Sequence, residues 1–410
     1  MNRSKRLMAG IGVAAAFVAG SATNSDAMKV KFVPINQNVA ASEVRLQALL
    51  KTQKPAPPEV KRPVIQIAIL LDTSNSMDGL ISQAKTHLWK IVNEFISAKQ
   101  NGQAPDLRVA LYEYGNDSLS AKEGYIRQVT GFTDDLDKVS EDLFGLKTNG
   151  GSEFCGQVIG HAADTLAWSK SNSDFKAIFI AGNEPFTQGP VKYADACKKA
   201  IAKGIVINTI FCGNEAQGVN GKWKDGAVLA DGSFANINQN QTVVHIDAPQ
   251  DKEIVRLNTE LNSTFIAFGR EGAKGKEKQI EQDKNAKGLA NSVLAQRAAT
   301  KSSAFYSNAT WDLCDALKHK KVKIEDLKED QLPDNMKKMT IEQRKKYVAD
   351  MAKKREAIAA DIKKLSGERT KYVAAERKKL AEKKGEESLD EAIVKSVRSQ
   401  GAKKGFTFEK

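Results

Sequence analysis

Short apolar runs alternate with amphipathic stretches along residues 64–213. The apolar runs have the length of strands and are apolar at most positions, whereas the stretches between them repeat apolar residues every three or four positions, as a helix with one buried face does. This pattern predicts strands at 64–71, 107–115, 124–130, 175–182 and 205–213, and helices at 80–97, 136–146, 153–169 and 191–204.

Two further strands are predicted after residue 240. Two apolar runs, at 242–248 and 263–269, flank a predicted helix at 251–261. Because both runs are short and rich in β-branched or aromatic residues, we expect them to complete the sheet. The segment 213–241, rich in Gly, Asn and Asp, either rises beside the ligand-binding edge of the sheet and helps select a partner, or connects two elements with a short helix at 226–232.

The C-terminal third of the chain is predicted to be helical. Residues 276–306 form a long helix candidate with a partial apolar face, and residues 310–318 carry an apolar anchor that packs back on the core. Residues 340–384 are almost all helix formers and predict a lysine-rich amphipathic helix or helical hairpin, interrupted by Gly367 and Gly385, that could form a coiled coil.

These patterns indicate a fold class. Mostly apolar strands that alternate with helices are typical of a mostly parallel, doubly wound α/β sheet with helices on both faces. The 410 residues, 41% of them apolar, can bury a large core. The predicted organisation is a signal peptide at 1–27, an N-terminal segment and proline-rich linker at 28–60, the α/β domain at 61–270, a helical extension that packs on the core at 271–317 and a basic helical tail at 318–410.

The N-terminus has the pattern of an export signal. Arg3, Lys5 and Arg6 precede an apolar span at 7–19, and small residues suited to cleavage follow by residue 27. Retention as a membrane anchor is the alternative, although this span is shorter than the roughly 20 residues that cross a bilayer. The sequence therefore predicts a periplasmic or secreted protein.

The basic charge is concentrated at the C-terminal end. Residues 318–410 hold 27 Lys and Arg against 17 Asp and Glu, so they supply +10 of the formal net charge of +13. Nucleic acid is not an expected partner, because an exported protein meets little of it and acidic residues are interleaved with the basic ones. A solvated helix face is one interpretation of this tail, and attraction to an anionic surface of the cell envelope is the other.

The four cysteines are Cys155, Cys197, Cys212 and Cys314, and they lack the spacing of a zinc site. In an exported protein they could form a disulfide or remain buried thiols. If a disulfide forms in the core, we favour Cys155 with Cys212, because the helix that contains the first begins, and the strand that contains the second ends, at the same edge of a parallel sheet.

A polar cluster follows the first predicted strand. Asp72 ends this strand, and Ser74 and Ser76 follow it at spacings of two and four residues. Ligands of α/β sheets bind beyond the carboxyl ends of the strands. One carboxylate and two hydroxyls are hard oxygen ligands that suit Mg²⁺, and a single carboxylate would leave the ion open to a carboxylate from a partner. Alternatively, these side chains only hydrogen-bond the loop.

The sequence LDTSNSM at 71–77 resembles the first element of the metal-ion-dependent adhesion site of von Willebrand factor type A (VWA) domains, which is Asp-x-Ser-x-Ser after the first core strand. Asp72, Ser74 and Ser76 match it residue by residue. The resemblance extends over about residues 61–245, including the order of strands and helices. It implies a Rossmann-like VWA fold that binds a protein partner through a metal ion.

The other two elements of that site match less closely. Where the family has a Thr in a glycine-rich loop before a helix, Ser152 in KTNGGSEFCG supplies a hydroxyl. Where the family has the Asp of a Thr-Asp-Gly sequence, at the end of the fourth core strand, this chain has Gly182, and Asn183 or Glu184 could substitute for that Asp. The resemblance thus implies a degenerate Mg²⁺ site formed by Asp72, Ser74, Ser76, Ser152 and Glu184.

Two candidate catalytic motifs in the sequence are incomplete. The glycine-rich segment 145–156 lacks the Lys-Ser or Lys-Thr ending of a phosphate-binding loop. Cys155 lies near a predicted helix start, but His161, six residues later, faces nearly the opposite side of that helix, so the two do not suit a nucleophile and its base. We therefore expect a non-catalytic, exported VWA-type binding module, and the alternatives are a metal-free scaffolding protein of the envelope that interacts through its basic tail and, more remotely, a hydrolase.

Overall fold

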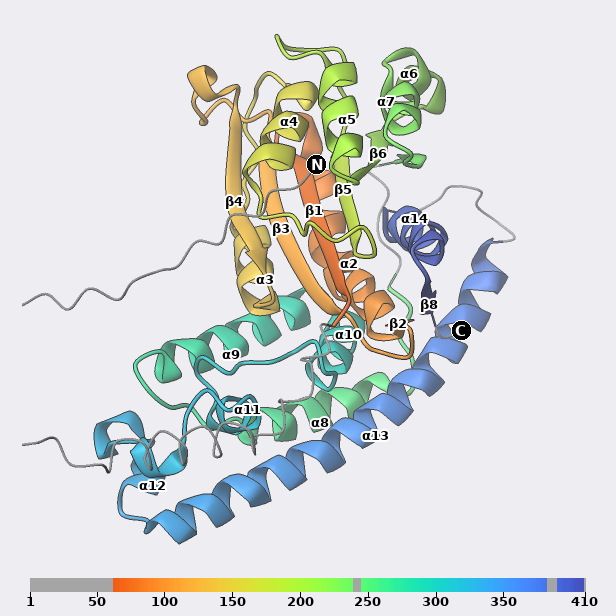
Figure 1. Cartoon of the computed structure of the whole chain (residues 1–410). Helices are drawn as coiled ribbons and strands as arrows, with labels where there is room; N and C mark the ends of the chain where they lie inside the picture. Colours follow the sequence, from red (N-terminus) through yellow and green to blue (C-terminus); the bar gives the residue numbers. More distant parts are fainter. Residues whose placement is uncertain (1–61, 239–244, 382–388, 409–410) are drawn as a thin grey trace, which may run out of the picture. The chain divides into compact units, whose positions relative to one another are not determined.

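A six-stranded sheet of order β4-β3-β1-β5-β6-β7 lies at the centre of the N-terminal half of the residues that the computed structural model describes, which are 62–238, 245–381 and 389–408 (Figure 1). Every neighbouring pair is parallel except β3 with β4. The strands are β1 (Val64–Asp72), β3 (Asp106–Tyr114), β4 (Ile126–Thr133), β5 (Phe175–Gly182), β6 (Val206–Cys212) and β7 (Phe234–Ile237).

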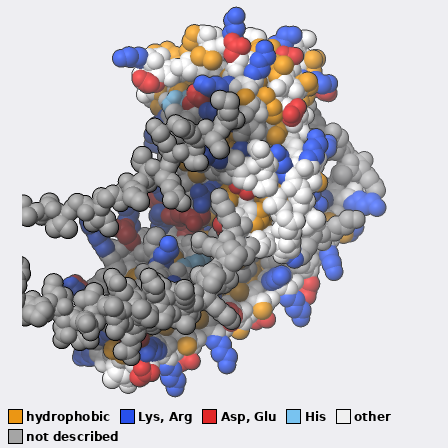
Figure 2. Space-filling model, viewed as in Figure 1, with side chains coloured by type: hydrophobic (Ala, Val, Ile, Leu, Met, Phe, Trp, Pro, Cys, Tyr) orange, Lys and Arg blue, Asp and Glu red, His pale blue; other side chains and the backbone are white. Residues whose placement is uncertain are grey.

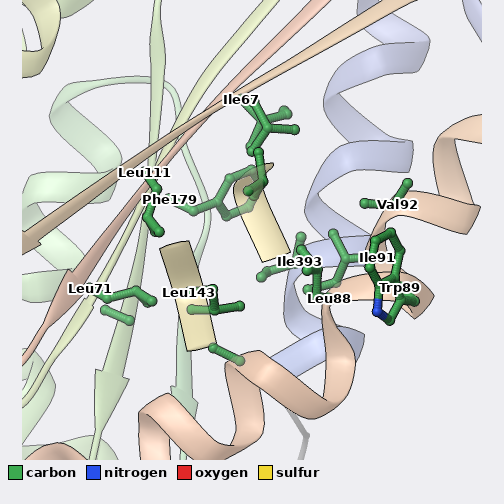
Figure 3. Packing of buried hydrophobic residues seen from close by; sticks show 14 of the residues in the cluster. Ile67, Leu71, Leu88, Trp89, Ile91, Val92, Leu111, Leu143, Phe179 and Ile393 are labelled. Carbon is green, nitrogen blue, oxygen red and sulfur yellow. The ribbon is translucent and has the colours of Figure 1, made fainter. Parts of the chain in front are cut away.

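One face of this sheet is covered by α2 (Asp78–Ile96) and α3 (Leu136–Gly145). The close-up in Figure 3 shows Ile67 and Phe179 of the sheet pointing toward Leu88 and Ile91 of α2. Side chains at alternate positions of each strand reach this face, as the pleat of a strand requires. The first core therefore forms between the sheet and these helices.

The opposite face packs on α4 (Cys155–Thr165), α5 (Tyr193–Ala202) and α7 (Trp223–Leu229). The strand residues that face the first core alternate with residues such as Leu70 and Ile178, which face this second one. Because both faces are buried, the strands are apolar along nearly their whole length. The predicted α/β fold with helices on both faces of a mostly parallel sheet is confirmed.

The chain after the sheet is helical, as the sequence predicts. Its long helix α13 packs on α8, α10 and α11 (Figure 1). The elements are α8 (Asp251–Ser263), α9 (Gly272–Leu289), α10 (Asn291–Lys301), α11 (Leu313–Lys318), α12 (Asp334–Lys337), α13 (Ile341–Ala381) and α14 (Leu389–Lys403), with short 3-10 turns at Asn75–Met77, Ala121–Glu123, Ile324–Asp326 and Glu329–Gln331 and a further α-helix, α6, at Glu215–Asn220.

A buried ionic cluster joins these helices to the sheet domain. Arg297 of α10 is fully buried and bonds Asp137 of α3 and Asp283 of α9, each at 2.6 Å. Lys301 bonds Asp283 at 2.9 Å, and the Tyr306 hydroxyl donates to Asp137 at 2.5 Å. Because each buried charge has an opposite charge beside it, the cluster avoids most of the desolvation cost of isolated ions.

The last helix and strand also belong to the domain's packing. Ile393 and Val397 of α14 lie in the first core, beside α2. Residues after α14 form β8 (Phe406–Phe408), which pairs in an antiparallel manner with β2 (Ala98–Gln100). The C-terminal segment therefore contributes buried surface to the α/β domain.

Two of the predicted strands are not strands in the structure. Residues 245–248 are irregular and the rest of the run 242–248 lies outside the described residues, whereas 263–269 forms only an isolated bridge from Ala267 to Asp312. The aromatic and aliphatic side chains of the second run, such as Phe265 and Ile266, are buried among the C-terminal helices. Burial there explains the apolar run, and the sheet ends at β7 instead.

Two predicted helices also differ in their continuity. The candidate at 276–306 is split at Ala290, whose backbone is extended, into α9 and α10. In contrast, Gly367 does not interrupt α13. A single glycine costs a helix only about 1 kcal/mol relative to Ala. The buried residues Ile362 and Arg369, which precede and follow Gly367, pack α13 against its neighbours.

The proposed disulfide between Cys155 and Cys212 is wrong. All four cysteines are free and buried. The Cys155 thiol instead lies 3.8 Å from the Tyr114 hydroxyl. Burial raises the pKa of all four thiols, to about 12 for Cys197 and Cys314.

No helix among the described ranges is both long and apolar enough to cross a membrane. The predicted signal peptide and linker, at 1–60, lie outside those ranges.

Candidate metal-binding site

Asp72 ends β1 in the middle of the sheet, between β3 and β5. Its side chain is fully buried, because neighbouring strands flank it on both sides. Oδ1 accepts a hydrogen bond from the backbone N–H of Ser74 at 2.8 Å. Oδ2 is also buried, and no described residue donates a hydrogen bond to it. A buried carboxylate oxygen without a donor indicates a place for a ligand.

The first motif is assembled by the turn that follows β1. Met77 N–H donates to the Ser74 carbonyl at 3.0 Å, which folds the chain back into a 3-10 turn before α2. The turn brings the hydroxyls of Ser74 and Ser76 to within 3.2 Å of one another. Asp72, Ser74 and Ser76 therefore come together as the spacing predicts.

The loop after β5 reaches the same point. The side-chain amide of Asn183 donates to the Ser76 hydroxyl at 3.0 Å, and Asn183 Oδ1 is buried without a donor among the described residues. Gly182 stands directly before it, at the place where the family has Asp. A Cβ on Gly182 would lie 3.0 Å from Asp72 Oδ2 and in hard contact with the Tyr114 hydroxyl. No side chain fits there with this backbone.

An acidic residue that we did not predict completes the cluster. Glu153 is buried, and its Cγ and Asp72 Oδ1 both lie beside Gly115, at 2.7 and 3.0 Å from the point that a Cβ there would occupy. The Ser74 side chain lies close enough to both carboxyl groups to lower the pKa of each. The signal for Glu153 was its place beside Ser152 in the glycine-rich loop, but a sequence pattern does not say which of two adjacent loop residues points inward.

The structure treats the other two predicted ligands differently. Ser152 is half-buried and makes no hydrogen bond to Asp72 or to the two serines of the first motif. Glu184 is half-buried and lies close enough to Glu153 to raise the pKa of that carboxyl by charge repulsion. Neither is brought to Asp72 as directly as Glu153.

Burial makes the two inner carboxyls costly to ionise. Desolvation raises the pKa of Asp72 to about 7, hydrogen bonds from Ser74 oppose the rise, and the charge of Glu153 adds to it. Desolvation, followed by repulsion from Glu184, also raises the pKa of Glu153 to about 7. Neither carboxyl forms an ion pair with any Lys, Arg or His that the structure describes. A bound cation would remove this electrostatic cost.

The oxygen atoms gathered at this site are of the chemical type that Mg²⁺ binds. Carboxylate and hydroxyl oxygens are the ligands that this ion prefers, and it commonly keeps several waters. Among the described residues no group of three or more His, Cys, Asp and Glu side chains is arranged to hold a metal. A site here must therefore combine the acids with the serine hydroxyls, as the Asp-x-Ser-x-Ser pattern does.

The segment between β6 and the end of the sheet supports this loop region. It is not a plain loop, because it forms α6, α7 and β7. Trp223 of α7 is fully buried against Phe186 and Phe211, and its indole N–H donates to the Glu184 carbonyl at 2.7 Å. The segment thus fixes the backbone that follows β5.

Part of this chain matches the model of a known domain family. Residues 66–220 match the model of the von Willebrand factor type A domain. This range contains β1, its Asp-x-Ser-x-Ser turn, and the strands and helices up to α6. The resemblance predicted from the sequence is therefore confirmed. A search of the curated proteins found no match.

The solved structures that match part of this chain are distant in sequence. The conserved hypothetical protein BatB from Bacteroides thetaiotaomicron is 15% identical over 42% of this chain and 90% of its own, with a TM-score of 0.33. The SpRpn10 VWA domain is 14% identical over 44% of this chain and 90% of its own, with a TM-score of 0.34. The vWF domain of the type V pili tip protein Mfa5 from Porphyromonas gingivalis is 12% identical over 44% and 91%, with a TM-score of 0.32.

Proposed function

Because residues 66–220 form a VWA domain, a fold consistent with a protein-interaction module, we propose that this protein binds a protein partner through a divalent cation, best Mg²⁺, at the carboxyl end of β1. The observation that carries the proposal is the buried Asp72 Oδ2, to which no described residue donates a hydrogen bond. The Ser74 and Ser76 hydroxyls stand beside it as further oxygen ligands. The cation would supply an electrophilic point that accepts an oxygen atom of the partner.

The chain's own residues would orient this contact. Asn183 holds the Ser76 hydroxyl, and the backbone N–H of Ser74 holds one oxygen of Asp72, while no described residue donates to the other oxygen. Fixed ligands of this kind lower the entropy that is lost when the ion binds. We assign no catalytic role to any residue.

Thermal unfolding with and without cation tests the proposal. A cation that binds only the folded state must raise the melting temperature, and the rise must grow with its concentration. We expect millimolar Mg²⁺ to stabilise the wild type relative to a chelator, and to leave Asp72→Asn unchanged. Asp231→Asn is the matched control, because this exposed Asp lies in a turn outside the site and should respond as the wild type does. An identical melting temperature in Mg²⁺ and chelator for the wild type would rule out the site.

Export is part of the proposal and rests on the sequence alone. Residues 1–27 have the pattern of a signal peptide, and we place the mature protein in the periplasm or outside the cell. Sequencing the N-terminus of the protein recovered from an envelope or periplasmic fraction would test this, because cleavage near residue 27 is the expected result.

A second candidate function uses α13 and needs no metal. Lys346, Lys353, Lys364, Lys371 and Lys378 are exposed, and none of them forms an ion pair with a described residue. Their spacings of seven and eleven residues are close to whole numbers of helical turns, so the five share one face over about 48 Å. Figure 2 shows lysine and arginine side chains along the lower right edge, where α13 runs in Figure 1, with acidic side chains between them.

This lysine stripe suits an anionic lipid surface of the envelope, toward which each lysine adds roughly 1 kcal/mol. Replacing all five lysines with Gln tests it in vesicle sedimentation at low and high salt. The matched control replaces five exposed lysines elsewhere, at positions 122, 192, 198, 224 and 252, and removes the same charge. The expected result is salt-sensitive binding that only the stripe variant loses. Equal sedimentation of the two variants would reject the candidate function.

A further inference from the structure

The carboxylate that the family's third motif supplies is absent here, and the structure leaves no room for it. Gly182 stands at that place, and a Cβ there would come within 3.0 Å of Asp72 Oδ2. If this site is to hold a divalent cation as firmly as the family's site does, another element must supply the missing negative charge. The opposite side of Asp72 offers one.

Glu153 approaches Asp72 from the loop that precedes α4. A Cβ on Gly115 would lie 2.7 Å from Glu153 Cγ and 3.0 Å from Asp72 Oδ1, so both acidic side chains lie against this glycine and close to one another. Gly115 follows β3 directly and has φ of +75°, a conformation that favours glycine. The close approach of Glu153 to Asp72 thus depends on a position without a side chain.

Neighbouring contacts hold Glu153 in this place. Its backbone N–H donates to the Gln188 side chain at 2.5 Å, which ties the loop to the segment after β5. Its side chain is buried, and no Lys, Arg or His among the described residues pairs with it. Two neighbouring buried carboxyls that lack a basic partner among the described residues form an arrangement that proteins avoid unless a cation or a proton balances it.

We propose that Glu153 supplies the second carboxylate ligand of the cation, in place of the Asp that is absent at position 182. This inference rests on the proposed function of the site at Asp72. It assigns to Glu153 the ligand role that the resemblance implies for Ser152 and Glu184. Ser152 makes no hydrogen bond to the first motif, and the charge of Glu184 acts on Glu153. Two carboxylates would balance the charge of a divalent ion.

Isothermal titration of the full chain with MgCl₂ separates these roles. We expect Asp72→Asn to abolish measurable binding and Glu153→Gln to weaken it by about tenfold or more, as the loss of a charged ligand does. Ser152→Ala should stay within about threefold of the wild type. Glu184→Gln is the matched control for the loss of charge alone, because it removes one negative charge next to Glu153. Its affinity for Mg²⁺ should also stay within about threefold of the wild type.

Each outcome bears on one claim. Wild-type affinity in Glu153→Gln, together with loss of binding in Asp72→Asn, overturns the role of Glu153 and leaves the proposed function standing. Equal weakening by Glu153→Gln and Glu184→Gln also overturns it, because a general loss of charge would then explain both. Absence of binding of Mg²⁺, Mn²⁺ and Ca²⁺ to the wild type overturns both claims. If Glu153→Gln does not fold, Glu153→Asp keeps the charge but withdraws the carboxylate by one methylene, and unchanged affinity would again reject the ligand role.

Discussion

Asp72 Oδ2, to which no described residue donates a hydrogen bond, lies 3.0 Å from the point that a Cβ on Gly182 would occupy. The same Cβ would collide with the Tyr114 hydroxyl, which donates to the Ala181 carbonyl at 3.0 Å. Gly182 is thus required by the packing around Asp72. The family's third acid cannot be restored here by a simple substitution.

Gly182→Asp should therefore destabilise the protein and should not strengthen Mg²⁺ binding. A new side chain in this space must displace Tyr114 or the backbone of β5, which costs about 1–3 kcal/mol, and it adds a third negative charge. Urea denaturation and Mg²⁺ titration measure the two effects. Gly367→Ala is the control, because nothing lies within 4 Å of the added methyl in α13, and it should leave stability unchanged or raise it slightly.

Stability without metal should fall as the pH rises, because of Asp72. Its pKa is about 7 in the folded state and near 3.8 when exposed, so the folded state binds more protons between these values. The stability that this group contributes at low pH is lost as the pH rises through about 7. The loss is on the order of 4 kcal/mol.

Asp72→Asn isolates this contribution. In chelator, we expect the variant to lose less stability than the wild type between pH 5 and pH 8, and to be more stable than the wild type at pH 8. Urea denaturation at the two pH values measures this. Parallel pH profiles of the two proteins would show that Asp72 is ionised at little cost.

Arg297→Met should destabilise the protein by about 3–5 kcal/mol, because it leaves the buried carboxylates of Asp137 and Asp283 with less compensation. Arg256→Met is the matched control, since this exposed Arg pairs with Glu253 and Glu260 on the surface of α8 and should cost less than about 1 kcal/mol. Urea denaturation compares them. Similar costs for both would mean that the buried cluster does not clamp the helices to the sheet domain.

The four thiols should be unreactive in the folded protein. All are buried, and burial raises the pKa of each, so the thiolate that attacks a disulfide reagent is scarce. A colorimetric thiol assay without reductant should detect none before unfolding and four afterwards. Detection of two after unfolding would reveal a disulfide and contradict the structure.

The sequence determined the elements whose side chains repeat with a regular period. The strands β1, β3, β4, β5 and β6 and the helices α2 to α5 follow from this period, because a buried face requires apolar residues at its own spacing. It also determined the cluster of Asp72, Ser74 and Ser76, since these residues lie within one turn and their spacing fixes their proximity. Local patterns were sufficient wherever the interacting groups are close in the chain.

The tertiary structure decided what the apolar run at 263–269 packs against, and that Ile393 enters the first core. An apolar pattern reports that a segment is buried, and it does not identify the segment that buries it. The same limit applies to Glu153, which is brought to Asp72 by a loop that passes a glycine at the end of another strand. In such loops no period constrains the side chains, so long-range packing alone sets which of two neighbouring residues faces the site.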